Sequence, residues 1–463
     1  MAAAPHTRLT RSRRSLERLL GLVEVPGASA RQPRVQVSGG LDDRATWLVD
    51  GEWRVFAEPA RELLSGGQEI ALFEVAGDDT LSASFDPARN AVFLPFSPEK
   101  AYINYLTEAW KGKSPRRGLS PGQLDAFYRA KRFIPRRLQI RARQMLIRRE
   151  GLPEFPRWPL DMSVSRLLRF YAYVELLARG EREATFRWFW PESHRAALIL
   201  THDVETAEGL TLAVELADLE QEHGFRSSFN LGAWYEVDPG IIRELTDRGF
   251  EIGMHGLRHD RSLFSSRAAF DAQRPEIAKL SARLGAEGFR SPATHRVFDW
   301  IGELPISYDG SIPHSDPFEP QPGGCCSLWP FFIGDVVELP YTLPQDYTLF
   351  TLLAHRSPAL WLEQADRIVQ ENGLIHSLSH PDPGYLGDAA NRDRYREFLV
   401  ALSERDEIWK PLPRELAAWW RTRDTAKGDE NGVTRGIIRI GESADEAQLI
   451  PPPTAEALSS DRP

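Results

Sequence analysis

Only two cysteines occur in the 463 residues, and they are adjacent, at Cys325 and Cys326. Because neighbouring cysteines rarely bridge each other, the sequence excludes a disulfide framework like that of small secreted domains. Long apolar runs are also lacking, since no segment approaches the roughly 18 apolar residues of a membrane span. The stretch 16–23 is interrupted by Glu17 and Arg18, which is typical of an amphipathic helix and not of a signal peptide. These absences predict a cytoplasmic protein.

An excess of basic residues is lacking as well. There are 57 Lys and Arg against 66 Asp and Glu, giving a formal net charge of −9, which argues against general nucleic-acid binding. Hydrophobic residues make up 42% of the chain and charged residues 27%, as in ordinary soluble globular proteins. Because single hydrophobic cores stop growing near about 250 to 300 residues, the length predicts two domains.

Four stretches of different character follow one another. Residues 1–110 mix a short basic helix with strand-like pieces and glycine turns, which predicts a small α+β domain of unknown role. Residues 111–190 are expected to form a basic helical connector. From 191 to 424, strand-like and helix-like segments alternate, which predicts an α/β domain with a parallel sheet covered by helices. Residues 425–463 are polar and rich in Pro, Glu and Asp, which predicts a mostly disordered tail.

The segment 111–150 is strongly basic, with thirteen Lys or Arg against Asp125 and Glu150. Apolar residues are interleaved with these charges, so part of the segment fits an amphipathic helix. One interpretation is peripheral contact with an anionic membrane surface or with a phosphate-bearing glycan carrier. The other is a solvated helix face that packs on the next domain.

His255 and His259 form the most informative pair in the sequence. On a helix, positions i and i+4 lie on one face, close enough to share a metal ion. The pair follows the short segment 249–254, which predicts a buried strand that opens into a loop. Taken alone, the two residues fit a pair of surface histidines equally well, so the interpretation depends on the segments around them.

Other strand-like segments place ionisable residues near their ends. The apolar run 196–201 is followed by Asp203 and Glu205, and carboxylates after a buried strand are typical of active sites in α/β folds. Because Asp203 and Glu205 are two residues apart, both side chains lie on one side of an extended segment. Further segments of this kind carry Arg290, Asp309, His376 and His380.

The order of these segments resembles the polysaccharide deacetylase superfamily (NodB-like, carbohydrate esterase family 4). The resemblance covers roughly residues 190–420, about half of the chain. The segments that are similar to its five motifs are, in order, Thr201-His202-Asp203-Val204-Glu205, His255-x-x-x-His259, Arg290-Ser291-Pro292, Asp309 and Leu378-Ser379-His380. The resemblance implies that the parallel sheet closes into a distorted (β/α) barrel, which periodicity alone does not distinguish from an open sheet.

The resemblance also implies an activity, namely a metal-dependent hydrolase that removes an N-acetyl group from a sugar of a glycan or glycan precursor. The expected cofactor is a divalent metal, zinc first among the candidates, bound by Glu205, His255 and His259. Many members of the superfamily have two adjacent aspartates in the first motif, whereas this chain has Val204 after Asp203. By analogy with relatives that use an Asp-x-Asp spacing, Asp203 is expected to be the general base. The alternative, with Asp203 on the metal, stays open.

The remaining roles concern proton transfer. Arg290 is expected to pair with Asp203 and to keep it ionised. Asp309 is expected to orient the histidine that acts as general acid. His380 is the candidate for that acid because it lies nearer the C-terminal end of its strand, whereas His376 is expected to be an interior histidine. The loop 311–324 is expected to lie over the site, with His314 and Asp316 either touching substrate or serving the loop.

Three alternatives remain at this point. The first is hydrolysis of a non-sugar amide by the same motifs, and the second is O-deacetylation. The third is a catalytically degenerate glycan-binding protein. It is allowed by Val204 in the first motif and by Ala293 after the third, where the superfamily commonly has an aromatic residue. A cytoplasmic location fits poorly with a wall polysaccharide as substrate. It favours a lipid-linked or soluble carbohydrate precursor at the inner membrane face.

Overall fold

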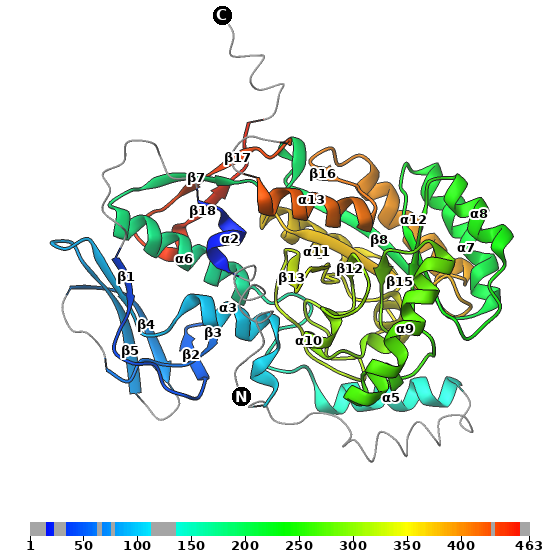
Figure 1. Ribbon diagram of the computed structural model, residues 1–463, viewed down its shortest axis with the longest axis horizontal. Helices are drawn as coiled ribbons and strands as arrows, with labels where there is room; N and C mark the ends of the chain where they lie inside the picture. The colour runs from blue at the N-terminus through cyan, green and yellow to red at the C-terminus, as the bar shows by residue number, and fades with distance from the viewer. Residues whose placement is uncertain are drawn as a thin grey trace, which may run out of the picture.

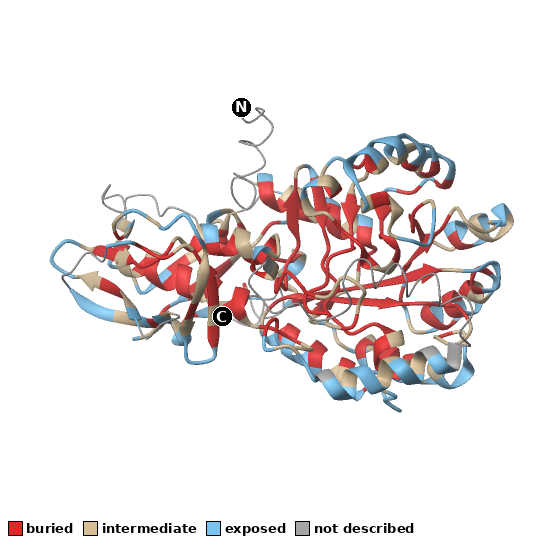
Figure 2. Cartoon of the chain, turned by 90° about the horizontal axis from the view of Figure 1, so that it is seen from below, coloured by how far each residue is buried: buried red, intermediate tan, exposed pale blue. Residues whose placement is uncertain are grey.

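The computed structural model describes residues 15–22, 34–62, 67–75, 79–112, 136–426 and 431–453. Three sheets organise these residues, and Figure 1 shows a larger unit built around a curled sheet beside a smaller unit made largely of the early strands. Buried residues run through the strands of both units, whereas the outer faces of the helices are exposed (Figure 2). None of the described helices is long and apolar enough to cross a membrane.

The larger unit contains a nine-stranded sheet with the order β13-β14-β12-β11-β10-β9-β8-β15, and β16 pairs with β8. All of its strand pairs are parallel except β13–β14. Its strands are β8 (Ala196–Val204), β9 (Ser228–Leu231), β10 (Glu251–Met254), β11 (Gly288–Phe289), β12 (Tyr308–Asp309), β13 (Phe331–Ile333), β14 (Val336–Glu338), β15 (Leu374–Ser379) and β16 (Ile408–Trp409).

Helices follow most of these strands and cover the sheet, as strand–helix alternation predicts. They are α7 (Ala207–Glu222), α8 (Pro239–Asp247), α9 (Arg267–Leu284), α10 (Phe298–Ile301), α11 (Ala359–Gln370), α12 (Ala389–Ser403) and α13 (Pro413–Thr425). Short turns of helix are η2 (Pro191–Ser193), η3 (Ser262–Phe264), η4 (Pro292–Thr294) and the π-helix η5 (Tyr347–Leu352).

The two ends of the curled sheet meet through hydrogen bonds. After β14 the chain runs beside β15, where the backbone N–H groups of Thr342 and Leu343 both donate to the carbonyl of His376 at 3.2 Å. The His376 N–H donates in turn to Thr342 Oγ1 at 2.9 Å. Closure by an irregular segment in place of a paired strand is what makes the barrel distorted, and the predicted (β/α) barrel is confirmed in this form.

The smaller unit is built on a six-stranded sheet with the order β1-β6-β5-β4-β2-β3. Its strands are β1 (Arg34–Val37), β2 (Thr46–Asp50), β3 (Trp53–Ala57), β4 (Gln68–Val75), β5 (Asp79–Asp86) and β6 (Ala91–Leu94), and its helices are α2 (Leu16–Leu20), α3 (Pro98–Leu106) and η1 (Ala109–Gly112). The mostly buried helix α6 (Ser163–Arg179) packs against β1, β3 and β6. Residues 163–179 therefore belong to a packed unit, and the connector expected over 111–190 is wrong for this helix.

The chain after residue 425 is also more ordered than its polarity predicts. Strands β17 (Arg435–Arg439) and β18 (Gln448–Ile450) form an antiparallel sheet with β7 (Glu183–Arg187). The expectation of a disordered tail is thus wrong for this stretch. Composition did not reveal these strands because β17 pairs with a strand that lies far earlier in the sequence. Residues 427–430 and 454–463 lie outside the described residues.

A buried ion cluster joins the smaller unit to the barrel. Glu108, which precedes η1, accepts hydrogen bonds from Arg296 at 2.6 Å and lies 2.7 Å from the Lys111 ammonium group. The side chains of Arg296 and Glu108 are 2% and 9% exposed. Burial alone would raise the pKa of Glu108, but the charges of Arg296 and Lys111 outweigh it and lower the pKa to about 2.

Replacing Glu108 with alanine removes the main partner of the Arg296 guanidinium and leaves a buried charge uncompensated. We expect Glu108→Ala to lower the free energy of unfolding by about 3 to 5 kcal/mol, measured by urea denaturation. The control is Glu52→Ala, because the Glu52–Arg157 pair is exposed, with 71% of the Glu52 side chain accessible. It should cost less than about 1 kcal/mol, and equal losses in the two variants would contradict the role of the buried cluster.

Candidate active site at the carboxyl ends of the barrel strands

The polar side chains of strand β8 face two different sides, the covering helices and the barrel interior. All nine of its positions are buried, so each polar group needs a partner inside the protein. His202 faces the helices, where its Nε2 lies 2.7 Å from Glu220 Oε1 on α7. Thr201 and Asp203 have the opposite parity and face the inside of the barrel. Thr201 Oγ1 lies 3.0 Å from His376 Nε2 and Asp203 Oδ1 accepts a hydrogen bond from Asn230 at 2.8 Å.

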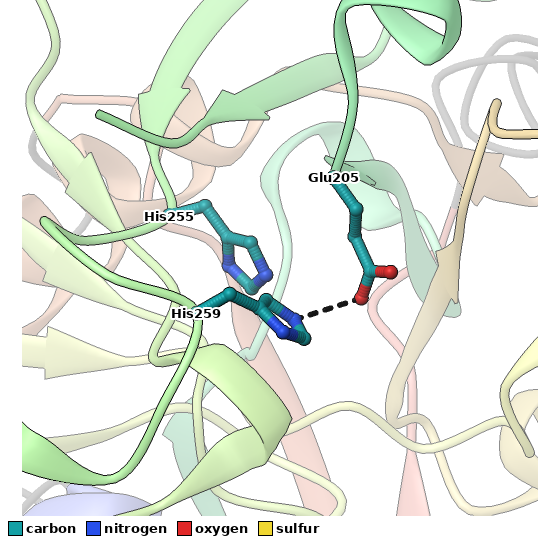
Figure 3. Close-up of side chains that lie close together, drawn as sticks. All are labelled: Glu205, His255 and His259. Carbon is teal, nitrogen blue, oxygen red and sulfur yellow. Dashed lines mark ion pairs between the residues drawn. The ribbon is translucent and has the colours of Figure 1, made fainter. Parts of the chain in front are cut away.

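Glu205, His255 and His259 lie together just beyond the ends of β8 and β10 (Figure 3). One donor atom from each lies within 4.8 Å of the others, and among the described residues this is the group of histidine, cysteine and acidic side chains that could hold a metal. His259 Nε2 and Glu205 Oε1 are 2.9 Å apart. Glu205 belongs to this group, and Asp203 lies beside it, with its Oδ2 3.7 Å from His255 Nδ1.

The two histidines do not lie on a helix, contrary to the expectation from their spacing. Residues 255–260 form a loop of bends after β10. Gly256 has φ +96°, a left-handed conformation that favours glycine, and a Cβ atom there would lie 3.2 Å from Pro292. This turn brings the centroids of the His255 and His259 rings to 5.7 Å. The i, i+4 spacing thus identified two histidines that do lie together, although a loop and not a helix brings them to each other.

His255 is held in the form that binds a metal. Its Nδ1 lies 3.0 Å from the backbone carbonyl of Arg290, so Nδ1 carries the proton and Nε2 is left with a lone pair. Burial lowers the pKa of His255 to about 4 despite the nearby charge of Asp203. The imidazole is therefore neutral at physiological pH, as a metal ligand has to be. A backbone carbonyl on the second nitrogen is the usual support of a ligating histidine.

Glu205 and His259 stabilise each other's charged forms. Burial would raise the pKa of Glu205, but the hydrogen bond and charge of His259 lower it far below its ordinary value. Burial would lower the pKa of His259, and the same hydrogen bond from Glu205 raises it instead. The contact with Glu205 thus favours the protonated form of His259, which supplies beside this carboxylate the kind of positive charge that a bound cation would supply. Two imidazole nitrogens and one carboxylate are a donor set that fits a catalytic divalent metal.

Asp203 is ionised inside the barrel. Burial would raise its pKa, but the charges of His255 and Arg290, together with the hydrogen bond from Asn230, lower it. Because His255 is neutral at physiological pH, Arg290 and the protonated His380, whose charge also lowers the pKa of Asp203, are the lasting positive charges near this carboxylate. Gly253 is essential to this arrangement, since a Cβ atom there would lie 2.0 Å from Asn230 Oδ1. The lack of a side chain at Gly253 of β10 thus leaves room for the Asn230 amide that binds Asp203.

Arg290 acts on Asp203 through space and does not form the expected ion pair with it. Its Nη2 donates to Thr201 Oγ1 at 3.1 Å and lies 3.1 Å from His376 Nε2. The side chain is buried, and its Nε and Nη1 atoms have no hydrogen-bond partner among the described residues. The positive charge of Arg290 is therefore directed into the barrel interior, where Asp203 is one of the groups that it stabilises.

His380 follows β15 and is paired with Asp346. Its Nδ1 lies 2.8 Å from Asp346 Oδ1, and its backbone N–H donates to Asp346 Oδ2 at 3.1 Å. Burial would lower the pKa of His380, but the charge and hydrogen bond of Asp346 raise it to about 10. His380 is thus protonated at physiological pH. The ring of Tyr385 packs against the imidazole at a centroid distance of 4.7 Å.

The expected pairing of Asp309 with His380 is wrong. Asp309 instead accepts hydrogen bonds from the backbone N–H and the hydroxyl of Ser311, at 3.0 and 2.8 Å. It also contacts Glu338 on the neighbouring strand β14, and burial raises the pKa of both carboxyl groups. Two buried carboxyl groups in contact share a proton more readily than they both ionise. Asp309 therefore holds the loop after β12 in place, and this part of the barrel rim is not the part that contains His380.

Three other histidine and acid positions are structural. His376 is buried and bonded at both nitrogens, with its Nδ1 3.0 Å from the carbonyl of Leu339, in agreement with its expected interior role. His314 is also fully buried, where its Nε2 accepts a hydrogen bond from the Asp161 N–H at 2.9 Å. Asp316 binds the N–H of Phe318 at 2.8 Å. Of the two roles open for His314 and Asp316, their contacts fit support of the loop.

Two residues that brace Glu205 gave no signal in the sequence. Trp234, in the loop after β9, donates its indole N–H to the Glu205 carbonyl at 2.9 Å, and its ring lies 5.5 and 5.2 Å from His255 and His259. Asp382, after β15, accepts a hydrogen bond from the Glu205 N–H at 2.9 Å and one from the Thr206 hydroxyl. Both positions lie far from Glu205 in the sequence, and only the fold brings them to it.

Comparisons with known proteins identify similar folds. No family model matches the chain, and no curated protein matches it significantly. Solved structures similar to part of the chain include proteins assigned as polysaccharide deacetylases, the superfamily that the motifs resemble. The protein from Mycobacterium smegmatis is 19% identical, covers 51% of this chain and 94% of its own, and has a TM-score of 0.43. The protein from Pseudomonas aeruginosa PAO1 is 15% identical, with coverages of 50% and 93% and a TM-score of 0.40.

Another similar structure is Puue allantoinase, at 16% identity, with coverages of 50% and 92% and a TM-score of 0.37. At these identities and scores, the matches do not decide between activities. The activity depends on the side chains of the site itself.

The pairing of His380 with Asp346 makes a prediction for the metal-free protein. Removing the charge at position 346 takes away the main cause that raises the pKa of His380, so Asp346→Asn should shift the imidazole titration to lower pH. Histidine NMR resonances followed against pH would measure this. The control is Asp388→Asn, which removes a carboxylate charge in the same region, where Asp388 Oδ1 accepts a hydrogen bond from the Gly384 N–H. A titration of His380 that is unchanged in Asp346→Asn would show that the pair does not set its pKa.

Proposed function

We propose that this protein is a metal-dependent hydrolase that removes an N-acetyl group from a sugar of a glycan or glycan precursor. The observation that carries the proposal is the cluster of Glu205, His255 and His259 beside an ionised Asp203 and a protonated His380. Amide hydrolysis needs an activated water molecule, a stabilised oxyanion and a protonated leaving nitrogen. The site supplies a candidate for each of these needs at one end of the barrel.

The metal would be held by Glu205, His255 and His259. A divalent cation on such ligands lowers the pKa of a water molecule and polarises an acyl oxygen. Zinc is the first candidate, although ligands of this kind accept several divalent metals. The hydrogen bond from His255 Nδ1 to the Arg290 carbonyl fixes the orientation of one ligand. Trp234 and Asp382 fix the backbone of another, Glu205.

Asp203 and His380 would divide the proton transfers between them. Asp203 is ionised, so it is able to accept a proton from the attacking water molecule. His380 is protonated, so it is able to donate a proton to the nitrogen of the departing amine. Two titratable groups whose surroundings move their pKa values in opposite directions are a common basis of acid–base catalysis. Asp346 would keep His380 protonated and oriented.

A sugar as substrate is supported by the aromatic rings at the site. Trp234 contacts both histidines and Tyr385 contacts His380, and both aromatic side chains are partly exposed. Exposed aromatic faces stack on the apolar faces of pyranose rings. We propose a glycan, or a lipid-linked or soluble precursor of one, as the substrate class. Assignment to the cytoplasm, with contact at the inner membrane face, is part of the same proposal.

Metal content tests the ligand set. Purified wild-type protein should contain about one equivalent of zinc or a similar divalent ion, and His255→Ala and Glu205→Gln should lose it, as measured by elemental analysis. The matched controls are His355→Ala and Glu208→Gln, because both residues are exposed and lie outside the cluster. Wild-type protein that binds no metal after supplementation would contradict the proposed metallohydrolase.

The role of Asp203 is tested separately from metal binding. Asp203→Asn should keep the metal, because position 203 lies outside the ligand cluster, and should lower the rate of acetate release about 100- to 10,000-fold, as expected for loss of a general base. Side-by-side metal analysis and acetate assays would measure the two effects. Loss of the metal in Asp203→Asn would instead assign Asp203 to the metal.

The substrate class is tested by profiling acetate release. N-acetylated sugars and their oligomers should be hydrolysed, including lipid-linked forms, and small non-sugar amides should not. The metal-free protein and Asp203→Asn serve as the background for each substrate. Hydrolysis of non-sugar amides alone would show that the substrate class is a non-sugar amide and not a sugar. Release from O-acetylated sugars alone would identify an O-deacetylase, and sugar binding without hydrolysis a degenerate glycan-binding protein.

A further inference from the structure

Exposed apolar side chains are concentrated on and just after one helix, α5 (Arg136–Glu150). Of the six large hydrophobic side chains that the described residues leave exposed, four lie within 15 residues of one another. They are Leu138 at 52%, Met145 at 73%, Leu146 at 45% and Leu152 at 46% exposed. Single exposed hydrophobic residues are ordinary on a protein surface, whereas a group of them marks an interaction surface.

Exposed arginines share this side of α5. Arg141, Arg148 and Arg149 are exposed, and none of them has a hydrogen bond or ion pair to a described residue. They lie three, ten and eleven positions after Leu138. At 3.6 residues per turn, this spacing places them along the same half of the helix as Leu138 and Met145. The outer surface of α5 therefore combines apolar and basic side chains, with no described acidic one between them.

The opposite side of α5 is fixed to the barrel. Arg143 donates to the backbone carbonyl of Phe318, and its guanidinium group lies 5.5 Å from the centroid of the Tyr347 ring. Gln144 Nε2 donates to the carbonyl of Thr351 at 2.9 Å. Tyr347 and Thr351 both belong to η5. In Figure 1 the helix lies along the outer edge of the barrel unit, and Leu138, Met145 and Leu146 on its other side are exposed.

We infer that the outer side of α5 docks this protein on an anionic lipid surface. A helix that presents Leu and Met beside arginines inserts its apolar side chains at the headgroup boundary while its guanidinium groups bind lipid phosphates. The rest of the chain makes this orientation specific, because a molecule with net charge −9 is repelled by an anionic surface except at a basic patch. The occupant is a membrane and not a soluble polyanion, since a polyanion would leave Met145 and Leu146 in water.

Docking through α5 would bring the open end of the barrel near the headgroups. The helix contacts η5, which begins directly after Asp346, the partner of His380 at the carboxyl end of β15. A substrate carried on a lipid would then be presented at the right end of the barrel, and this consequence rests on the proposed function. The docking itself does not depend on that function, because it involves no residue of the candidate active site.

Vesicle binding by the full-length protein tests the inference. Co-sedimentation with vesicles of equal parts phosphatidylcholine and phosphatidylglycerol should show binding that weakens at high salt, and pure phosphatidylcholine vesicles should show little. The triple variant Arg141→Glu/Arg148→Glu/Arg149→Glu should bind at least about 100-fold more weakly, from about fivefold per lost basic residue. Absence of binding by the wild type to the mixed vesicles would overturn the inference.

A second variant tests the apolar part of the surface. Met145→Asp/Leu146→Asp should weaken binding on the order of tenfold or more, because two partly inserted side chains are replaced by repelled charges. Binding to vesicles by this double variant at wild-type strength would overturn the inference. So would wild-type binding to soluble heparin as strong as its binding to vesicles.

Matched controls exclude general effects of the substitutions. Leu72→Asp/Val400→Asp replaces two similarly exposed apolar residues elsewhere, and Arg44→Glu/Arg243→Glu/Arg283→Glu changes the net charge by the same amount. Both controls should bind the mixed vesicles nearly as the wild type does. A loss of binding in them as large as in the α5 variants would overturn the assignment to α5. Thermal unfolding and metal content of every variant show whether the fold and the candidate active site are intact.

Discussion

The site depends on the burial of β8 on both of its sides. A strand covered by helices on one side and by the barrel interior on the other cannot leave a polar side chain without a partner. His202 therefore turns to Glu220 on α7, and Asp203 turns inward to Asn230. The same alternation carries Glu205 to the rim on the inner side, where the loop after β10 brings the histidines. The carboxylate of the cluster is positioned by the packing of a strand and not by a flexible loop.

Charges inside the barrel are arranged so that neighbouring groups take opposite roles. Asp203 has a lowered pKa and His380 a raised one, whereas burial raises the pKa of both Asp309 and Glu338 and the contact with Asp309 raises that of Glu338 further. Burial opposes the charged form in every case, so the sign of each shift depends on which partner lies nearby. For His380 that partner is Asp346, a single buried carboxylate that accepts hydrogen bonds from both the ring and the backbone N–H.

The sequence predicted the parts of this arrangement that follow from local pattern. Alternating strands and helices predicted a parallel sheet covered by helices, and the resemblance of the motifs implied its closure into a barrel. The spacing of Asp203 and Glu205 predicted that they share one face. The pairings that failed all depend on contacts between distant segments. Asp346 lies directly before the π-helical segment η5 and belongs to no motif, and no local signal distinguishes it from Asp309. The strand β17 contains Ile437 and Ile438, but it lies in a polar stretch, and its partner β7 precedes the barrel. The loop conformation at His255 and His259 was equally hidden, since a positive φ at Gly256 replaces the expected helix.

The candidate site has two halves that are held by different parts of the chain. The metal-binding half rests on β8, β10 and the loop that contains Trp234. The acid half rests on β15 and on η5, which is also where α5 attaches. Glu319 connects these neighbours electrostatically, because burial raises its pKa to about 7 while the charges of Arg143 and His380 oppose that rise. The outer helix α5 is attached at η5, directly beside Asp346. Under the proposed function this attachment lies next to the partner of the proton donor, whereas the metal ligands lie after β8 and β10.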